Sequence, residues 1–412
     1  MKPGSGSGSR SVLELTRRAA LAAGLSGCFR LARPSDPEAP FSDLARRLTL
    51  EAWRDVDPRQ VLDAHVHVVG LGTGGTGCWV NPVMQQPGAH PLNALRFDIY
   101  KRAAGVDDDA RADQQYVGTL LSRIRRQLVH GRHLILAFDQ TYAEDGAARP
   151  ELTEFHTPND YVLRLARENP DAFVPCASIH PYRRDAVDEL ERCAAGGAVA
   201  VKWLPNAMFI DPGSPRCDAF YDALARLDVT LLTHAGEEKA VEAEEAQRFG
   251  NPLLFRRALD RGVRVVIAHC ASLGKNPDLD DPAQPWVDNF DLFTRLMEQK
   301  QYVGRLWGEV SAMTQANRAG RPLATVLERT EWHERLLNGS DYPLPAINVI
   351  VQTRVLKEKG FITAEQRRAL NEIDQRNPLQ FDYVLKRTLA WRGRRFPAEI
   401  FTPRGAFPRL ER

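Results

Sequence analysis

The chain has 412 residues, of which 43% are hydrophobic and 26% are charged, so it is long enough for one large barrel domain or for two ordinary domains. Its 55 Lys and Arg residues nearly balance its 53 Asp and Glu residues, and the net charge of +2 argues against nucleic acid as a partner. No uninterrupted run of about eighteen apolar residues occurs, so we expect no transmembrane helix.

The first 40 residues differ in composition from the rest of the chain. Residues 4–9 are a Gly/Ser run, and an arginine pair, Arg17 and Arg18, precedes the apolar stretch 19–25 and a Leu-Ser-Gly-Cys tetrad that ends at Cys28. The pair resembles a Tat export signal, and the tetrad resembles a lipobox that would place a lipid anchor on Cys28. Export would make the protein periplasmic or membrane-anchored; the alternative is a flexible arm on a cytoplasmic protein. In both cases we expect residues 1–40 to lie outside a single barrel domain of residues 41–412.

Eight short apolar runs rich in β-branched residues follow, with helical periodicity between them. They cover residues 61–69, 133–138, 173–179, 199–204, 229–233, 263–268, 306–311 and 336–339. Because each run is almost continuously apolar, both faces of each strand should be buried, which is typical of parallel strands covered by helices. Eight alternations of strand and helix predict an α/β fold, a distorted (β/α)8 TIM barrel.

Two long segments interrupt this alternation. Residues 70–132 separate the first two strands, open with a Gly-rich loop and contain a helix predicted over 115–129. Residues 274–286 follow the sixth strand and are rich in Pro and Asp. Both leave the carboxyl ends of strands, where barrel enzymes place their substrate loops, so we predict loop insertions after strands 1 and 6.

The first strand carries His65 and His67, separated by Val66. Alternate side chains of a strand face the same way, so the two imidazoles should project together. Two imidazoles side by side at a strand end can chelate one metal ion, although such pairs also occur without a metal.

Three more polar residues end predicted strands. His234 and His269 close the fifth and sixth apolar runs, and Asp341 follows the eighth. A lone buried histidine is more often structural, and the aspartate could simply begin a turn. Three such residues in a chain with a His-x-His strand would share one rim of the barrel, which favours a metal site with Asp341 as a ligand and proton acceptor.

Lys202 lies within the apolar fourth strand, so its side chain should be inside the barrel. A buried ammonium group is costly without a partner. Lys202 would either pair with carboxylates or lose its proton and react with carbon dioxide to form a carbamate, an anionic ligand that can bridge two metal ions.

His-x-His on strand one, Lys on strand four, His on strands five and six and Asp on strand eight together resemble the amidohydrolase superfamily. The segments around His65 and Asp341 look especially like amidohydrolase family 2. The resemblance spans residues 60–390. It implies that His65, His67 and Asp341 hold a more buried metal, that His234 and His269 hold a more exposed one, and that a carboxylated Lys202 bridges them.

Other residues near the strand ends are candidates for substrate contact. They are Trp79 after the Gly-rich loop, His180 and Arg183 after the third strand, and Trp203 beside Lys202. Structural roles are the alternative for His180 and Arg183. Glu309 and Ser311 on the seventh strand could also shape the pocket.

The resemblance implies an enzyme that uses one or two divalent metal ions, with zinc expected and manganese or iron as alternatives. The expected reaction is attack of activated water on an amide, ester or lactone bond, or on a phosphoester, of a small-molecule substrate, with Asp341 as the catalytic residue. Family 2 also includes decarboxylases, so a carbon–carbon lyase on the same barrel is the first alternative. A non-catalytic metal-binding barrel is the second. Barrels of this kind commonly form homodimers.

Overall fold

The computed structural model describes residues 36, 38–86, 88, 90–238, 244–347, 349–403 and 405–410. The arginine pair and Cys28, on which the export prediction depends, lie outside the described residues. None of the helices in the described part of the chain has both the length and the apolar character that crossing a bilayer requires.

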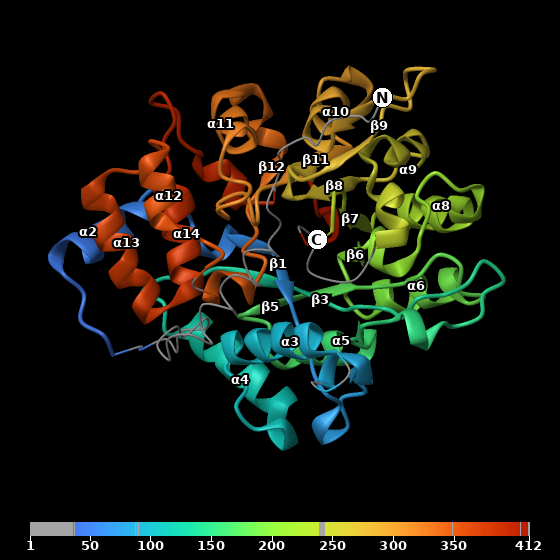
Figure 1. Cartoon of the computed structure of the whole chain (residues 1–412), viewed down its shortest axis with the longest axis horizontal. Coiled ribbons are helices and arrows are strands. Elements are labelled where there is room, and N and C mark those ends of the chain that lie inside the picture. Colours follow the sequence, from blue (N-terminus) through green and yellow to red (C-terminus); the bar gives the residue numbers. More distant parts are fainter. Residues whose placement is uncertain are drawn as a thin grey trace, which may run out of the picture.

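Eight parallel strands form the barrel (Figure 1). In their order around it they are β1 (Leu62–His67), β3 (Arg132–Leu136), β5 (Phe173–Ala177), β6 (Ala200–Trp203), β7 (Thr230–His234), β8 (Val265–Ala268), β11 (Leu306–Glu309) and β12 (Leu336–Leu337). The barrel closes where Ala64 N donates to Asn338 O at 2.9 Å and His67 N donates to Tyr342 O at 3.1 Å. The predicted α/β barrel is confirmed, with strands slightly shorter than their apolar runs.

Helices surround the barrel (Figure 1). They are α2 (Asp43–Ala52), α3 (Pro91–Ala103), α4 (Ala112–Arg125), α5 (Asn159–Glu168), α6 (Ala186–Ala195), α7 (Pro205–Met208), α8 (Asp218–Leu227), α9 (Arg256–Asp260), α10 (Asn289–Met297), α11 (Arg321–Glu328), α12 (Thr353–Glu358), α13 (Ala364–Arg376) and α14 (Pro378–Thr388). Local sequence sets several helix starts; Thr363 and Gln366, for example, form a capping box at α13. Helix α2 lies beside α13 and α14 although more than 300 residues separate them in sequence: Tyr383 OH donates to Ala52 O at 3.2 Å.

The predicted insertions form local structure at the carboxyl ends of the strands. The segment after β1 contains β2 (Trp79–Val80), α3 and α4, and β2 pairs antiparallel with β4 (Phe155–His156) from the loop after β3. The segment after β8 forms a two-stranded ribbon of β9 (Lys275–Pro277) and β10 (Trp286–Asp288). The first insertion therefore builds a wall beside the end of β1.

The C-terminal segment fills the opposite end of the barrel. Phe407 is completely buried in an apolar cluster with inward-facing residues of the strands, including Leu62 of β1 and Leu232 of β7. Thr230, the first residue of β7, donates its hydroxyl to Ala406 O at 2.5 Å. The amino ends of the strands are thus covered, and the carboxyl ends remain available for a site.

Candidate metal centre

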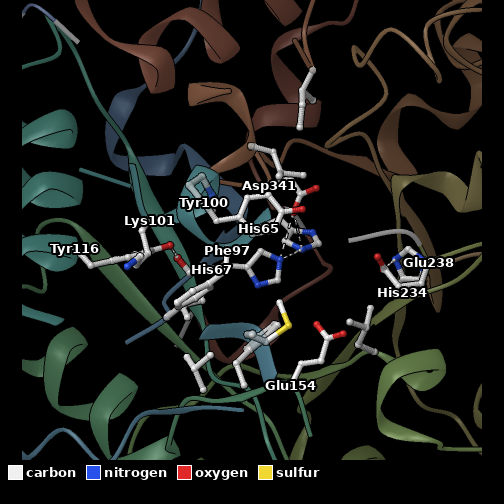
Figure 2. Close-up of a pocket in the computed structure, with 18 of the residues that line it drawn as sticks. His65, His67, Phe97, Tyr100, Lys101, Tyr116, Glu154, His234, Glu238 and Asp341 are labelled. Carbon is white, nitrogen blue, oxygen red and sulfur yellow. Dashed lines mark hydrogen bonds and ion pairs between the residues drawn. The ribbon is translucent and has the colours of Figure 1, made fainter. Parts of the chain in front are cut away.

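All six predicted ligands line one cavity at the carboxyl ends of the barrel strands. The cavity has a volume of about 220 Å³ and includes His65, His67, Lys202, His234, His269 and Asp341 in its lining. Figure 2 shows His65, His67 and Asp341 grouped together, with His234 to their right. These residues come from β1, β6, β7 and the segments after β8 and β12, so the barrel itself sets their spacing.

His65, His67 and Asp341 form the tightest group. The two Nε2 atoms of His65 and His67 lie 3.2 Å apart, and Asp341 Oδ1 lies 3.3 Å from His67 Nε2 and 3.6 Å from His65 Nε2. Ligand atoms held about 2.1 Å from one ion in a tetrahedral arrangement lie roughly 3.4 Å apart. The three side chains therefore fit a single divalent ion.

His234 and His269 stand next to this group. The rings of His65 and His269 have centroids 5.2 Å apart, those of His234 and His269 are 5.4 Å apart, and His269 Nε2 lies 3.9 Å from Asp341 Oδ2. His234 Nδ1 lies 3.4 Å from Glu238 Oε2, while its buried Nε2 has no hydrogen-bond partner among the described residues. A buried imidazole nitrogen without a partner, backed by a carboxylate on the other nitrogen, fits a metal ligand.

Lys202 is 1% exposed, and its Nζ lies 3.2 Å from His65 Nε2. Within the described chain its amine forms no ion pair, and burial lowers its pKa. The other fully buried lysine, Lys386, is satisfied differently, because it donates to Asp382 Oδ2 at 2.6 Å and to Gly339 O. Lys202 thus combines complete burial with the absence of a contact ion pair in the described chain, and Asp341 and Glu309 act on its charge only from a longer distance.

Glu309 and Ser311 contact the Nδ1 atoms of His65 and His269. Glu309 Oε2 lies 3.0 Å from His65 Nδ1 and accepts from Ser311 Oγ at 2.6 Å. Ser311 Oγ also lies 2.8 Å from His269 Nδ1. A proton on His65 Nδ1, donated to Glu309, leaves Nε2 as a lone-pair donor toward the cavity, which is the tautomer a metal requires.

The ionisation of the site suits a cation. Burial holds the pKa of His65 and of His269 well below 6.5 and lowers that of His234 to about 4, so these imidazoles are neutral at pH 7. Burial alone would raise the pKa of Asp341, but its histidine neighbours outweigh that effect and hold the pKa well below 3.8. Neutral imidazoles and an ionised carboxylate are the forms that bind metal.

Two of the six residues occupy an uncommon backbone conformation. His269 has φ 57° and Asp341 has φ 60°, both in the left-handed region. Such conformations cost about 1–3 kcal/mol each and concentrate at functional sites. Here they occur just beyond strand ends, where a regular strand would not continue.

The four residues considered for substrate contact do not line the cavity. His180 Nε2 hydrogen-bonds to Met208 O at 2.8 Å, and Arg183 pairs with Asp139 and Asp185. Trp203 alternates with Lys202 along β6, so it faces the helices, where it stacks on Phe220. Trp79 pairs through β2 with β4 and lies outside the lining.

The cavity lining includes residues that the sequence did not single out. They are chiefly Phe97, Tyr100, Tyr116, Glu154, Glu238 and Arg318 (Figure 2 labels all but Arg318). Glu238 and Arg318 lie after the fifth and seventh barrel strands, so position at a carboxyl strand end is the signal that could have identified them. The aromatic residues come from the first insertion, for which no strand register predicts an orientation.

Several solved structures are similar to this chain. An uncharacterised TIM-barrel protein from Bordetella bronchiseptica has 13% identity and a TM-score of 0.44, with 76% of this chain and 98% of that chain covered. A putative 2-pyrone-4,6-dicarboxylic acid hydrolase from Pseudomonas putida has 17% identity and a TM-score of 0.43, with 76% and 94% covered. A 5-carboxyvanillate decarboxylase from Sphingomonas paucimobilis has 15% identity and a TM-score of 0.39, with 76% and 96% covered.

Among curated proteins no significant match is found. A family model, described as amidohydrolase, matches residues 62–371. The matched segment runs from the first residue of β1 into α13 and includes all six residues of the candidate metal centre. The chain belongs to this amidohydrolase family.

Proposed function

We propose that this protein is a metal-dependent hydrolase that cleaves an amide, ester or lactone bond of a small molecule. The observation that carries the proposal is the environment of Lys202, a completely buried amine beside His65 with no ion pair in the described chain. A carbamate on Nζ would replace an unpaired cation with an anion at the junction of the two histidine groups. The modification would remove the cost of burying an unpaired cation and would supply an anionic ligand that two divalent ions could share.

The residues divide into two sets of ligands in this proposal. His65, His67 and Asp341 would hold one ion, His234 and His269 would hold a second, and a carboxylated Lys202 would contribute to both sets. Imidazole nitrogens with few carboxylates favour zinc, and manganese or iron also suit the set. Bound divalent ions would polarise the bond to be cleaved and lower the pKa of a water molecule toward 7.

In the proposed reaction, Asp341 accepts and returns a proton. Its histidine neighbours hold its pKa well below 3.8, so the carboxylate is ionised at neutral pH. Oδ1 faces His67 at 3.3 Å, whereas Oδ2 is 3.9 Å from His269 Nε2 and is the less engaged oxygen. We assign Oδ2 as the atom that takes the proton of the attacking water and returns it to the leaving group.

A decarboxylase on the same barrel is the second candidate. It is favoured by the spacing of His65, His67 and Asp341, whose ligand atoms all lie within 4.8 Å of one another and suffice for one ion. With a free Lys202, the group of His65, His67 and Asp341 would hold one ion alone. The two functions therefore differ in metal number and in the chemical form of Lys202.

The test begins with chelator-stripped protein that is reconstituted with zinc in ¹³C-bicarbonate. The proposal predicts a carbamate resonance in the ¹³C NMR spectrum that disappears in Lys202→Gln. Reconstituted protein should hydrolyse members of a panel of lactones, amides, esters and phosphotriesters, and release no carbon dioxide from aromatic carboxylates. A spectrum without the resonance, together with carbon dioxide release, would establish the decarboxylase instead.

Asp341→Asn tests the proton transfer on any substrate that the panel identifies. General acid–base catalysis contributes about 10²–10⁴-fold, so turnover should fall by at least that factor. Asp139→Asn is the matched control, because Asp139 is also buried but pairs with Arg183 outside the cavity. Equal losses in both variants would assign the effect to stability and not to catalysis.

A further inference from the structure

The cavity beside the metal centre has an apolar wall. Val69, Leu71, Val80, Met84 and Phe97 line it from the segment after β1, and Val349 and Ile350 line it from the segment after β12. In Figure 2, Tyr116 lies to the left of His67, and His234 and Glu238 lie to the right. A bound molecule that reaches the metal centre would therefore place an apolar body against this wall.

Charged side chains outside the six candidate ligands also line the cavity, and three of them are paired. Lys101 Nζ lies 2.7 Å from Asp109 Oδ1, Arg96 Nη2 lies 3.5 Å from Glu154 Oε1, and Glu238 Oε2 lies 3.4 Å from His234 Nδ1. Arg318 is different, because in the described part of the chain it makes no ion pair. Glu238 and Asp341 act on its charge from a longer distance, but no described carboxylate lies within ion-pair distance of the guanidinium group.

Arg318 lies in the segment between β11 and α11 and is 9% exposed. Its Nη1 donates to Ser272 Oγ at 3.1 Å, which fixes one edge of the guanidinium group. Its buried Nε has no hydrogen-bond partner among the described residues. A guanidinium keeps its charge at neutral pH, so burying it without a direct ion pair is costly.

We propose that Arg318 binds a carboxylate of the substrate, and that the substrate is a small hydrolysable molecule with an apolar body and one carboxylate group. The inference extends the proposed hydrolase function, because it names the class of molecule for which the metal centre would act. The arginine supplies the anion site, the apolar wall holds the body, and the scissile bond faces His67 and Asp341.

The shape of the guanidinium group suits a carboxylate. Its planar donors match the two coplanar oxygens of a carboxylate, and one guanidinium compensates one negative charge. Glu154 is already paired with Arg96, and Glu238 with His234, so neither carboxylate compensates Arg318 at contact distance. A single carboxylate is therefore the anion that this guanidinium group holds most directly.

Binding of an isosteric pair tests the inference without any turnover. Zinc-reconstituted protein is titrated with phenylacetate and with phenylacetamide in a calorimeter. Charge-assisted hydrogen bonds make the wild type bind phenylacetate more tightly, and Arg318→Gln should weaken phenylacetate by roughly 10- to 100-fold with little effect on phenylacetamide. Arg318→Lys should retain part of the preference, because it keeps the charge and loses the planar donors.

Arg335→Gln is the matched control. Arg335 is half-buried and donates to Met297 O at 2.9 Å, makes no ion pair within the described chain, and lies outside the cavity. It should bind phenylacetate as the wild type does. If Arg318→Gln does not fold, Ser272→Ala removes only the hydroxyl that orients Arg318 and should weaken phenylacetate several-fold.

Two results would overturn the inference. One is equal affinity of the wild type for phenylacetate and phenylacetamide. The other is phenylacetate binding that persists in Arg318→Gln but disappears after chelation, which would place the carboxylate on the metal. Neither result depends on hydrolysis, so failure of this inference and failure of the proposed function can be told apart.

Discussion

At the scale of single residues, the candidate site depends on the side chains that contact the candidate ligands as much as on the ligands themselves. Ser311 is central to these contacts, since its hydroxyl lies 2.8 Å from His269 Nδ1 and donates to Glu309 at 2.6 Å. Glu309, whose pKa burial raises to about 7, in turn contacts His65 Nδ1. One hydroxyl thus orients histidines from two different strands.

Ser311→Ala should lower zinc affinity by about 10- to 100-fold, the usual effect of losing a group that orients metal ligands. Calorimetric titration of stripped protein with zinc measures it. Thr314→Val is the control, because the buried Thr314 hydroxyl has no hydrogen-bond partner in the described residues. Equal affinities for Ser311→Ala and wild type would contradict the assigned positioning role.

His180 provides a pH test away from the cavity. Burial lowers its pKa from 6.5 to about 4, so below pH 6.5 the unfolded chain binds a proton that the folded chain does not, and stability falls as the pH falls toward 4. Between pH 7 and pH 5 the wild type should lose about 2 kcal/mol more stability than His180→Gln. Urea unfolding at both pH values measures the difference, and parallel losses would show that His180 is not buried in its neutral form.

At the scale of elements, close approach between β1, β11 and β12 sets the ligand positions. Gly339 follows β12, and a Cβ atom there would collide with Glu309 Oε1 and come within 2.8 Å of the His65 Cβ. Asp341 N donates to His65 O at 2.8 Å in the same region. The absence of a side chain at position 339 allows two metal-ligand segments to touch.

Gly339→Ala should therefore displace His65 or Glu309 and reduce zinc affinity more than tenfold, by the same loss of ligand orientation. Gly118→Ala is the control, because a Cβ at this position of α4 meets nothing within 4 Å and alanine is the better helix former by about 1 kcal/mol. That variant should be at least as stable as the wild type and bind zinc normally. Normal zinc binding by Gly339→Ala would disprove the steric argument.

At the scale of the whole molecule, candidate ligands from five positions around the barrel would link the two ends of the chain through a metal. β1 near the N-terminal side and the segment after β12 near the C-terminal side both contribute. Zinc at about 100 times its Kd would stabilise the folded state by about 2.7 kcal/mol. Chelation should accordingly lower the Tm of the wild type by several degrees, and an unchanged wild-type Tm would contradict the linkage.

The sequence predicted the barrel because each strand is a short apolar run between amphipathic helices, and the observed strands fall inside or at the edges of those runs. It also located the residues that the barrel gathers at its carboxyl end, since strand position decides where they point. Its place beside Lys202 predicts substrate contact by Trp203, but alternation along β6 puts Trp203 on the opposite face of the strand. Phe97 and Arg318 lie in segments between barrel strands, where packing against distant residues decides which side chains reach the cavity.

The most direct test of the central claim is the number of zinc ions bound per chain after stripping, reconstitution and dialysis, measured by mass spectrometry with inductively coupled plasma. We expect two ions in the wild type, because neutral imidazoles, an ionised Asp341 and a carboxylated Lys202 would supply two sets of ligands. A single ion would favour the decarboxylase alternative. A chain that retains no zinc would contradict the assignment of these six residues as a metal centre.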